Sequence, residues 1–299
     1  MAARLSNLLV LADFSQPDDT ALARALLLAR MHRAALHVMH HPRDDAVAPL
    51  PATLARARLA ARHLEEALER PVNMVVPKPR TFDETLAAQA RGADLVVVAH
   101  TRIRSLAALL HGQPTLRVLR ACRTPVLVVR AGPVERYSRI LVATELEPPS
   151  GRALDIAAWV EPSASLVLFH ALGTRDEAKL RSAEAPEWAV QQFRERRTRQ
   201  AERRLGEFVE SFRHAGRPMV SIGRGDPGQQ IAEHQLQLGA DLVIVGKRPA
   251  SPFEDFMRGS VAARVLNWST SDVLVIPLAG AEATDPGVHP MRKGVHHAH

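Results

Sequence analysis

Six residues in the second half of the chain have the spacing of a glycine-rich ligand loop. Gly223-Arg-Gly-Asp-Pro-Gly228 matches G-x-G-x-x-G and lies between an expected strand and an expected helix. In that context such a loop can bind a dinucleotide. The loop does not follow the first strand of its domain, however, and Asp226-Pro227 fits a helix start with aspartate as N-cap and proline in the first turn. We therefore prefer a helix start over dinucleotide binding here.

Other patterns that carry catalysis or metal binding are missing from the sequence. It has no G-x-x-x-x-G-K-[ST] P-loop, no G-x-S-x-G elbow, no H-E-x-x-H pair and no paired cysteines. His37 and His40 belong to one expected strand and alternate to opposite faces, which makes them a poor ligand pair. The C-terminal histidines are interpreted as solvated: His289, His296, His297 and His299. We predict no catalytic residue and no metal site.

The elements that would position any site occur twice. Gly92-Ala-Asp-Leu-Val-Val-Val98 recurs as Gly239-Ala-Asp-Leu-Val-Ile-Val245, and each is followed at the same spacing by a second apolar run. These later runs are Pro125-Val-Leu-Val-Val129 and Asp272-Val-Leu-Val-Ile276. The copies differ in the middle, where the second has extra residues in its central helical region. The sequence therefore predicts an internal duplication.

Each copy alternates apolar runs with amphipathic stretches, which is typical of parallel strands covered by helices on both faces. In the first copy we expect strands near 7–12, 35–40, 72–76, 94–99 and 126–130. In the second we expect strands near 139–144, 165–171, 218–222, 241–246 and 273–277. The predicted fold class is α/β, with two tandem five-stranded parallel, doubly wound (Rossmann-like) domains.

The expected boundaries follow the repeat. Residues 1–131 form domain 1, 132–138 a linker, 139–278 domain 2, and 279–299 a flexible tail that contains histidines.

Composition narrows the class of protein. The chain has 299 residues, 46% of them hydrophobic, and one cysteine, Cys122, so it can build two cores and needs no disulfide framework. It shows neither a signal peptide nor an apolar run that could cross a bilayer, and we expect a cytoplasmic location. The net charge of +7 is spread among acidic residues, which favours solvated helix faces over nucleic-acid binding.

The opening Leu8-Leu-Val-Leu-Ala-Asp13, the two A-D-L-V runs, the glycines that follow them and the closing V-L-V runs resemble the universal stress protein family. The resemblance covers both halves. It implies a five-stranded α/β domain, and pairing of two domains through their last strands. Val126–Val129 would then pair antiparallel with Val273–Ile276 inside one chain, as an internal pseudo-dimer.

The resemblance also implies ATP as a cofactor, bound through G-x-x-G, nine residues, and then G-S or G-T. Glycine lets phosphate approach the backbone, and the following helix offers free N–H groups. This sequence departs from the pattern: Arg102 and Ser105 replace the first two glycines in one half, and Pro249 and Pro252 replace them in the other. Proline removes a backbone donor.

Two places remain for a phosphate or nucleotide. The residues expected to bind it are Asp13, Arg102, Gly112 and Gln113 in the first half, and Glu145, Gly246, Lys247, Arg248, Gly259, Ser260 and Val261 in the second. The competing interpretation is that both glycine turns only start a helix.

The extra residues of the second copy predict a long helix over about 186–213. Its apolar stripe is Ala201, Leu205, Phe208, Val209 and Phe212. The basic run Arg194–Arg199, with Arg203 and Arg204, is interpreted as a solvated outer face.

We expect a non-catalytic stress-response protein that binds a small ligand or a protein. Two alternatives stay open: a slow nucleotide hydrolase or phosphotransfer enzyme, and a basic nucleic-acid-associated factor. Further dimerisation of the chain also stays open.

Overall fold

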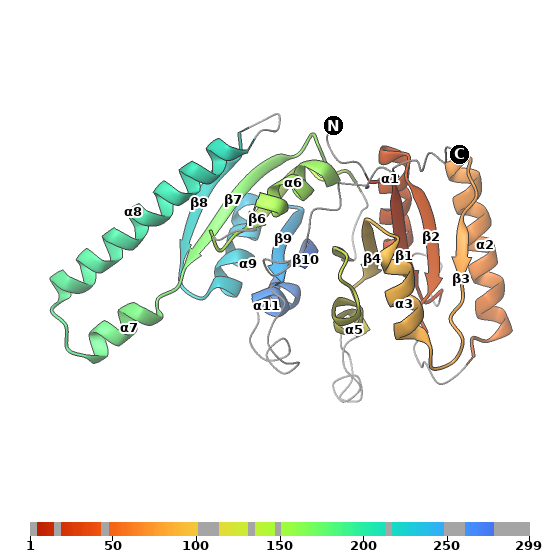
Figure 1. Ribbon diagram of the computed structural model, residues 1–299, viewed down its shortest axis with the longest axis horizontal. Coiled ribbons are helices and arrows are strands. Elements are labelled where there is room, and N and C mark those ends of the chain that lie inside the picture. Colours follow the sequence, from red (N-terminus) through yellow and green to blue (C-terminus); the bar gives the residue numbers. More distant parts are fainter. Residues whose placement is uncertain are drawn as a thin grey trace, which may run out of the picture.

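A computed structural model describes residues 5–14, 19–42, 48–100, 114–130, 135–146, 151–212, 217–247 and 261–277. In these residues the chain builds one extended sheet with helices on both faces (Figure 1). The strands are β1 Asn7–Ala12, β2 Ala35–His40, β3 Asn73–Val75, β4 Leu95–Ala99, β5 Val126–Val129, β6 Arg139–Ala143, β7 Ser165–Leu172, β8 Met219–Arg224, β9 Leu242–Lys247 and β10 Asp272–Pro277. The helices are α1 Thr20–His32, α2 Pro51–Leu68, α3 Phe82–Arg91, α5 Pro114–Ala121, α6 Gly151–Val160, α7 Arg175–Ser182, α8 Glu187–Ser211, α9 Pro227–Leu238 and α11 Val261–Trp268.

The strand order of the described sheet is β3-β2-β1-β4-β5-β10-β9-β6-β7-β8. Within each half all neighbours are parallel, and the two halves join where β5 and β10 run antiparallel, with Leu127 opposite Leu274. The predicted fold class and the predicted pairing of the last strands are both confirmed. The join removes two edge strands that would otherwise present unpaired backbone groups.

Strand residues alternate between two cores. One face of the sheet buries side chains such as Val10, Val97 and Ile244 against α1, α2, α6 and α8. The other buries side chains such as Leu9, Val96 and Val243 against α3, α5, α9 and α11. Because both faces are covered, β4 and β5 near the centre of the sheet are apolar at every position, as their continuous valine and leucine runs indicated.

The aspartate of each A-D-L-V repeat has a structural role. The Asp94 carboxylate accepts hydrogen bonds from the backbone N–H groups of Ser6 (2.8 Å) and Asn7 (2.9 Å) at the start of β1. Asp241 does the same for the N–H groups of Ser138 (2.7 Å) and Arg139 (3.1 Å) at the start of β6. The repeated aspartate therefore joins the first strand to the fourth in each half and lies away from the carboxyl ends of the strands.

A buried polar cluster holds the two halves together. Asp272, at the start of β10, accepts from the Tyr137 hydroxyl (2.7 Å) and the Arg130 backbone N–H (2.7 Å), and forms an ion pair with Arg24 of α1 (3.1 Å). Burial raises the pKa of Tyr137 well above its usual value, so its hydroxyl stays protonated and can donate. The Arg24 guanidinium also lies 4.2 Å from the centre of the Tyr137 ring.

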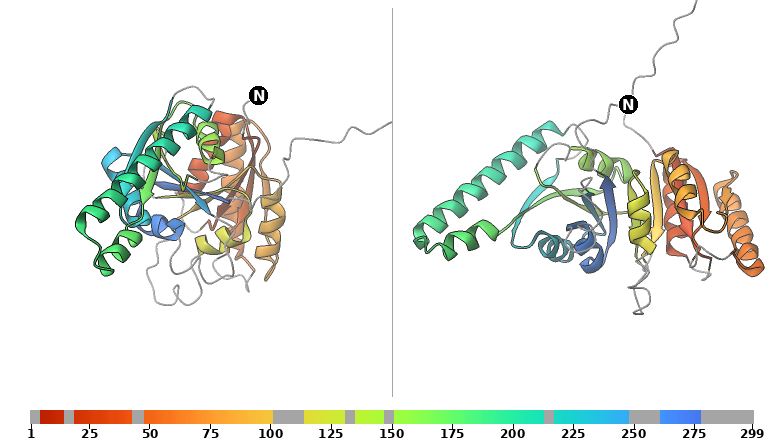
Figure 2. Two further views of the ribbon diagram at one scale, coloured as in Figure 1. Left: turned by 60° about the vertical axis from the view of Figure 1, so that its left-hand side comes forward. Right: turned by 60° about the horizontal axis from the view of Figure 1, so that its bottom comes forward.

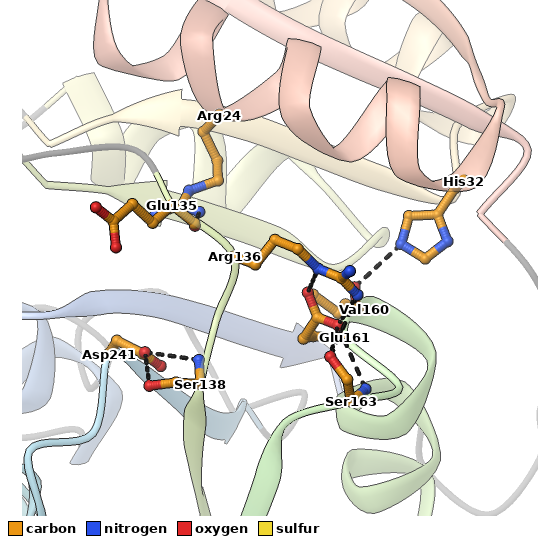
Figure 3. A network of polar contacts seen from close by, with 9 residues as sticks. All are labelled: Arg24, His32, Glu135, Arg136, Ser138, Val160, Glu161, Ser163 and Asp241. Atoms are coloured by element: carbon orange, nitrogen blue, oxygen red, sulfur yellow. Dashed lines mark hydrogen bonds and ion pairs between the residues drawn. The ribbon is translucent and has the colours of Figure 1, made fainter.

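The segment before β6 makes further contacts across this seam (Figure 3). Arg24 donates to the backbone carbonyl of Glu135, and a ring nitrogen of His32 lies 3.0 Å from the Val160 carbonyl of α6. Arg136 forms an ion pair with the buried Glu161 (2.6 Å). Residues 135–138, expected to be a linker, are thus fixed to both halves.

The extra residues of the second half form α7 and α8. Figures 1 and 2 show that α8 runs along β8. The N-terminal part of α8, together with α7, projects beyond the ends of the strands. Ala201, Leu205 and Val209 of the predicted apolar stripe are buried, and Phe208 and Phe212 pack partly against the core. The predicted stripe is confirmed, with the helix ending at Ser211.

No helix in the described part of the chain is long and apolar enough to span a membrane.

Candidate functional site

Each half has a topological switch point. In the first half the chain winds from β1 through β2 to β3, and then returns to the other side of β1 to form β4. The second half repeats this path around β6 and β9. In open α/β sheets ligands bind beyond the carboxyl ends of the strands at such a point.

The two switch points share the same local structure. Asp13 follows β1 and Glu145 follows β6 in the equivalent position. The next residue adopts a left-handed conformation in both, with φ of 53° at Phe14 and 59° at Leu146. A non-glycine residue rarely has positive φ, and such conformations concentrate at functional sites.

A histidine lies beside each acidic turn. His40 ends β2 opposite Ala12, and His170 lies in β7 one residue beyond the partner of Ala143. The ring of His40 stacks on Phe14, with centroids 6.1 Å apart. The sequence predicted no binding role for either histidine; their matching positions in equivalent strands were the available signal.

Carboxylates and rings lie near the first switch point. Burial lowers the pKa of His40, and Asp13 only partly offsets this effect. Burial also raises the pKa of Asp19, to which the nearby charge of Asp13 adds, although hydrogen bonds from two backbone N–H groups oppose the rise. His41 stacks on Phe82 with centroids 4.8 Å apart.

The positively charged side chain of Arg117, in α5, lies near the first switch point. It lies 4.9 Å from the Phe82 ring centre and forms a 2.6 Å ion pair with Asp83. Burial, followed by the charge of Arg117, lowers the pKa of His41 to about 4. His41 is therefore neutral near pH 7.

The second switch point has arginines close by. His170 Nδ1 lies 2.8 Å from the Thr144 carbonyl, which can only accept, so Nδ1 carries the proton. Burial lowers the pKa of His170, the Thr144 bond opposes this, and Arg197 and Arg204 of α8 lower it further. Helix α8 thus adds positive charge to the surroundings of His170, whereas the charge that acts on the equivalent His40 is the carboxylate of Asp13.

Acidic residues of α7 form ion pairs with arginines of α8 and β8. The buried carboxylate of Glu177 accepts from Arg194 (3.3 Å) and from Arg224 at the end of β8. Asp176 pairs with Arg197 at 3.0 Å. The predicted basic face is therefore divided: Arg194 and Arg197 pair inward with α7, while Arg196, Arg199, Arg203 and Arg204 are exposed.

The loop Gly223–Gly228 is a helix start, as preferred from the sequence. Asp226 caps α9 by accepting from the Gln229 N–H at 3.1 Å. A Cβ at Gly223 would lie 2.5 Å from the Phe169 ring, and one at Gly228 would lie 2.7 Å from Arg264. Close packing therefore explains these two glycines, and the backbone N–H of Gly225 already donates to Leu172.

The residues predicted to bind a nucleotide are placed only in part. Asp13 and Glu145 lie at the two switch points, Gly246 and Lys247 end β9 beside β6, and Val261 starts α11. The others lie outside the described residues: Arg102, Gly112, Gln113, Arg248, Gly259 and Ser260. Among described residues, no group of three His, Cys, Asp or Glu side chains is arranged to hold a metal ion.

Comparison with known proteins agrees with the duplication. The universal stress protein family matches residues 5–130 and again 136–277. Universal stress protein YxiE of Bacillus subtilis is 27% identical over 147 residues, which are 47% of this chain and 99% of that protein.

Solved structures share the whole tandem fold. A universal stress protein from Archaeoglobus fulgidus superposes with a TM-score of 0.64 at 17% identity, covering 92% of this chain and 97% of that one. A putative universal stress protein from Pseudomonas aeruginosa gives a TM-score of 0.61 at 21% identity, covering 91% and 93%.

Proposed function

The chain belongs to the universal stress protein family, and from this premise we propose that it acts in the cytoplasm by binding a small ligand rather than by catalysis. The first candidate ligand is an adenine nucleotide. Binding of a protein partner would follow from binding of this ligand. The tandem halves, with the proposed boundaries at residues 131, 138 and 278, act as one unit.

One observation carries the proposal. Both switch points have the same sequence of features: a carboxylate, a residue with positive φ, and a histidine on the neighbouring strand. A carboxylate here can accept hydrogen bonds from the hydroxyls of a ribose, as acidic residues do in other α/β nucleotide sites. The same arrangement in both halves favours a ligand site over incidental packing.

We propose that the phosphates bind to residues that follow β4 and β9 in the sequence. The proposed binding residues are Asp13, Arg102, Gly112 and Gln113 in the first half, and Glu145, Gly246, Lys247, Arg248, Gly259, Ser260 and Val261 in the second. Gly259-Ser260 precedes α11, whose first N–H groups can donate to an anion.

Calorimetry with ATP and ADP, with and without magnesium, tests the proposal. We expect micromolar binding. Glu145→Ala and Gly259→Trp weaken it if the second half holds the nucleotide, and Asp13→Ala weakens it if the first half does. The control is Glu84→Ala, which removes a carboxylate from the first turn of α3. Absence of binding at millimolar nucleotide would overturn the proposal.

A further inference from the structure

The outer face of α8 carries one continuous stripe of polar side chains. Its members are spaced so that each lies three or four residues from the next along one side of the helix. They line a single open groove: Gln192, Glu195, Arg196, Arg199, Gln200, Arg203, Arg204 and Glu207. The opposite side of α8 buries Val190, Ala201 and Leu205. The stripe therefore faces away from the sheet, on a helix whose N-terminal part projects beyond the strands (Figure 1).

Positive charge exceeds negative charge along the stripe. It holds four arginines and two glutamates, and Arg199 pairs with Glu195 at 2.9 Å. Arg196, Arg203 and Arg204 form no ion pair within the described part of the chain. Like charges three or four residues apart repel one another and destabilise a helix. A partner with negative charge removes this repulsion.

The acidic residues of α7 leave the charge of the stripe in place. Asp176 pairs with Arg197, and Glu177 pairs with Arg194. Both of these arginines lie outside the stripe, on the side of α8 that faces α7. The chain thus neutralises the arginines on one side of α8 and leaves those on the other side exposed to solvent.

An exposed tryptophan extends the stripe at the projecting end of α8. Trp188 lies four residues before Gln192, so it belongs to the same side of the helix. It is 70% exposed, although its large apolar ring gains from burial. From Trp188 to Glu207 the stripe is about 28 Å long, at about 1.5 Å per residue. Tryptophan and arginine are both enriched among the residues that dominate binding energy at protein interfaces.

We propose that the stripe from Trp188 to Glu207 is a docking surface for an acidic helix of another protein. Carboxylates of the partner pair with Arg196, Arg203 and Arg204. An apolar side chain of the partner covers the ring of Trp188. The stripe lies outside both switch points, so docking here does not require the proposed nucleotide.

Charge favours this partner over a second copy of the chain and over a nucleic acid. In a symmetric dimer the stripe would meet its own copy, and two faces with the same sign of charge repel. A nucleic acid has phosphates along its whole length, which would bring negative charge onto Glu195 and Glu207. A protein helix can place its carboxylates opposite the arginines alone.

A labelled acidic peptide is the probe. It is a helix of about 20 residues, long enough to fold in water and to span the stripe, with glutamate along one face, alanine elsewhere and leucine at one end. We expect it to bind the full chain with micromolar affinity in fluorescence anisotropy. Arg196→Gln combined with Arg203→Gln should weaken binding at least about tenfold, and Trp188→Ala should weaken it by a similar factor. The same peptide with glutamine in place of glutamate should not bind.

Helix α2 of the first half provides the matched control. It lies between the second and third strands, as α7 and α8 do in the second half. Arg58→Gln combined with Arg62→Gln removes the same charge from its exposed face, and should change peptide affinity by no more than about twofold. Equal weakening by the two double variants, or no binding of the acidic peptide, would refute the proposal. Thermal unfolding checks that each variant is folded.

Two further measurements test the other partners. If a single-stranded oligonucleotide binds more tightly than the peptide and loses affinity in the same arginine variant, the surface is a nucleic-acid site and the proposal is wrong. A concentration-dependent dimer in sedimentation that the arginine variant abolishes would assign the surface to a second copy instead. All of these assays omit ATP and ADP, so a failure of the proposed nucleotide binding leaves their outcome unaffected.

Discussion

At the carboxyl ends of their strands, the two halves share one backbone conformation but differ in the charges around it. Asp13 and Glu145, and His40 and His170, occupy equivalent positions. Asp19 and the stacked ring of Phe14 lie near the first pair, whereas the charges of Arg197 and Arg204 of α8 act on His170 of the second.

The difference shows which part of a duplicated domain can diverge. The strand register and the left-handed turn are set by backbone geometry and are alike in both halves. The charge that surrounds them comes from helices packed outside the sheet, which can be lengthened without changing the strands. Insertions are tolerated at such surface positions, so one scaffold can present two chemically different sites.

The largest effect is expected at Asp272, where the two halves differ at their join. Asp272 stands where the first half has Pro125, and it bonds Arg24, Tyr137 and Arg130. Replacing it with alanine leaves the buried Arg24 without its ion pair and should cost about 3–5 kcal/mol in the free energy of unfolding, measured in urea.

The control for this variant is Asp83→Ala, which breaks the more exposed pair with Arg117. Its cost should stay below about 1 kcal/mol. Similar small losses for both aspartates would mean that the seam does not depend on the buried cluster.

The second largest effect is a loss of stability at low pH, caused by His41 of the first half. The folded pKa of His41 is about 4, below the usual histidine value of 6.5, so the unfolded chain binds more protons between these values. Stability should therefore fall as pH drops from about 6.5 to about 4, by at most about 3 kcal/mol from this residue.

The His41→Gln variant should lose less stability over this interval than the unmodified chain, in urea unfolding at several pH values. Ala171 is the equivalent residue of the second half, where no such group exists. Identical pH profiles for the variant and the unmodified chain would show that His41 is freely hydrated.

The smallest effect tests how alike the halves are. Asp94→Ala and Asp241→Ala each remove a carboxylate that accepts from two backbone N–H groups. Each should cost about 1–2 kcal/mol; the Ser138 hydroxyl also donates to Asp241 at 2.7 Å. A large inequality, seen in parallel urea titrations, would show that the repeated aspartate has different roles.

The sequence alone was sufficient for the scaffold. Apolar runs at matching spacing predicted the ten strands to within one or two residues, and the family resemblance predicted the antiparallel join of Val126–Val129 with Val273–Ile276. These features depend on local periodicity and on the rule that both faces of a parallel sheet are buried, so they can be read along the chain.

Only the tertiary structure brought together the partners that give each site its character. Tyr137 and Asp272 are 135 residues apart, and nothing in either segment indicates the other. The charges of Arg197 and Arg204, interpreted from the sequence as part of a solvated face, lower the pKa of His170 because the C-terminal half of α8 packs on the sheet that contains β7. Such contacts depend on the packing of whole elements, which the spacing of residues along the chain does not encode.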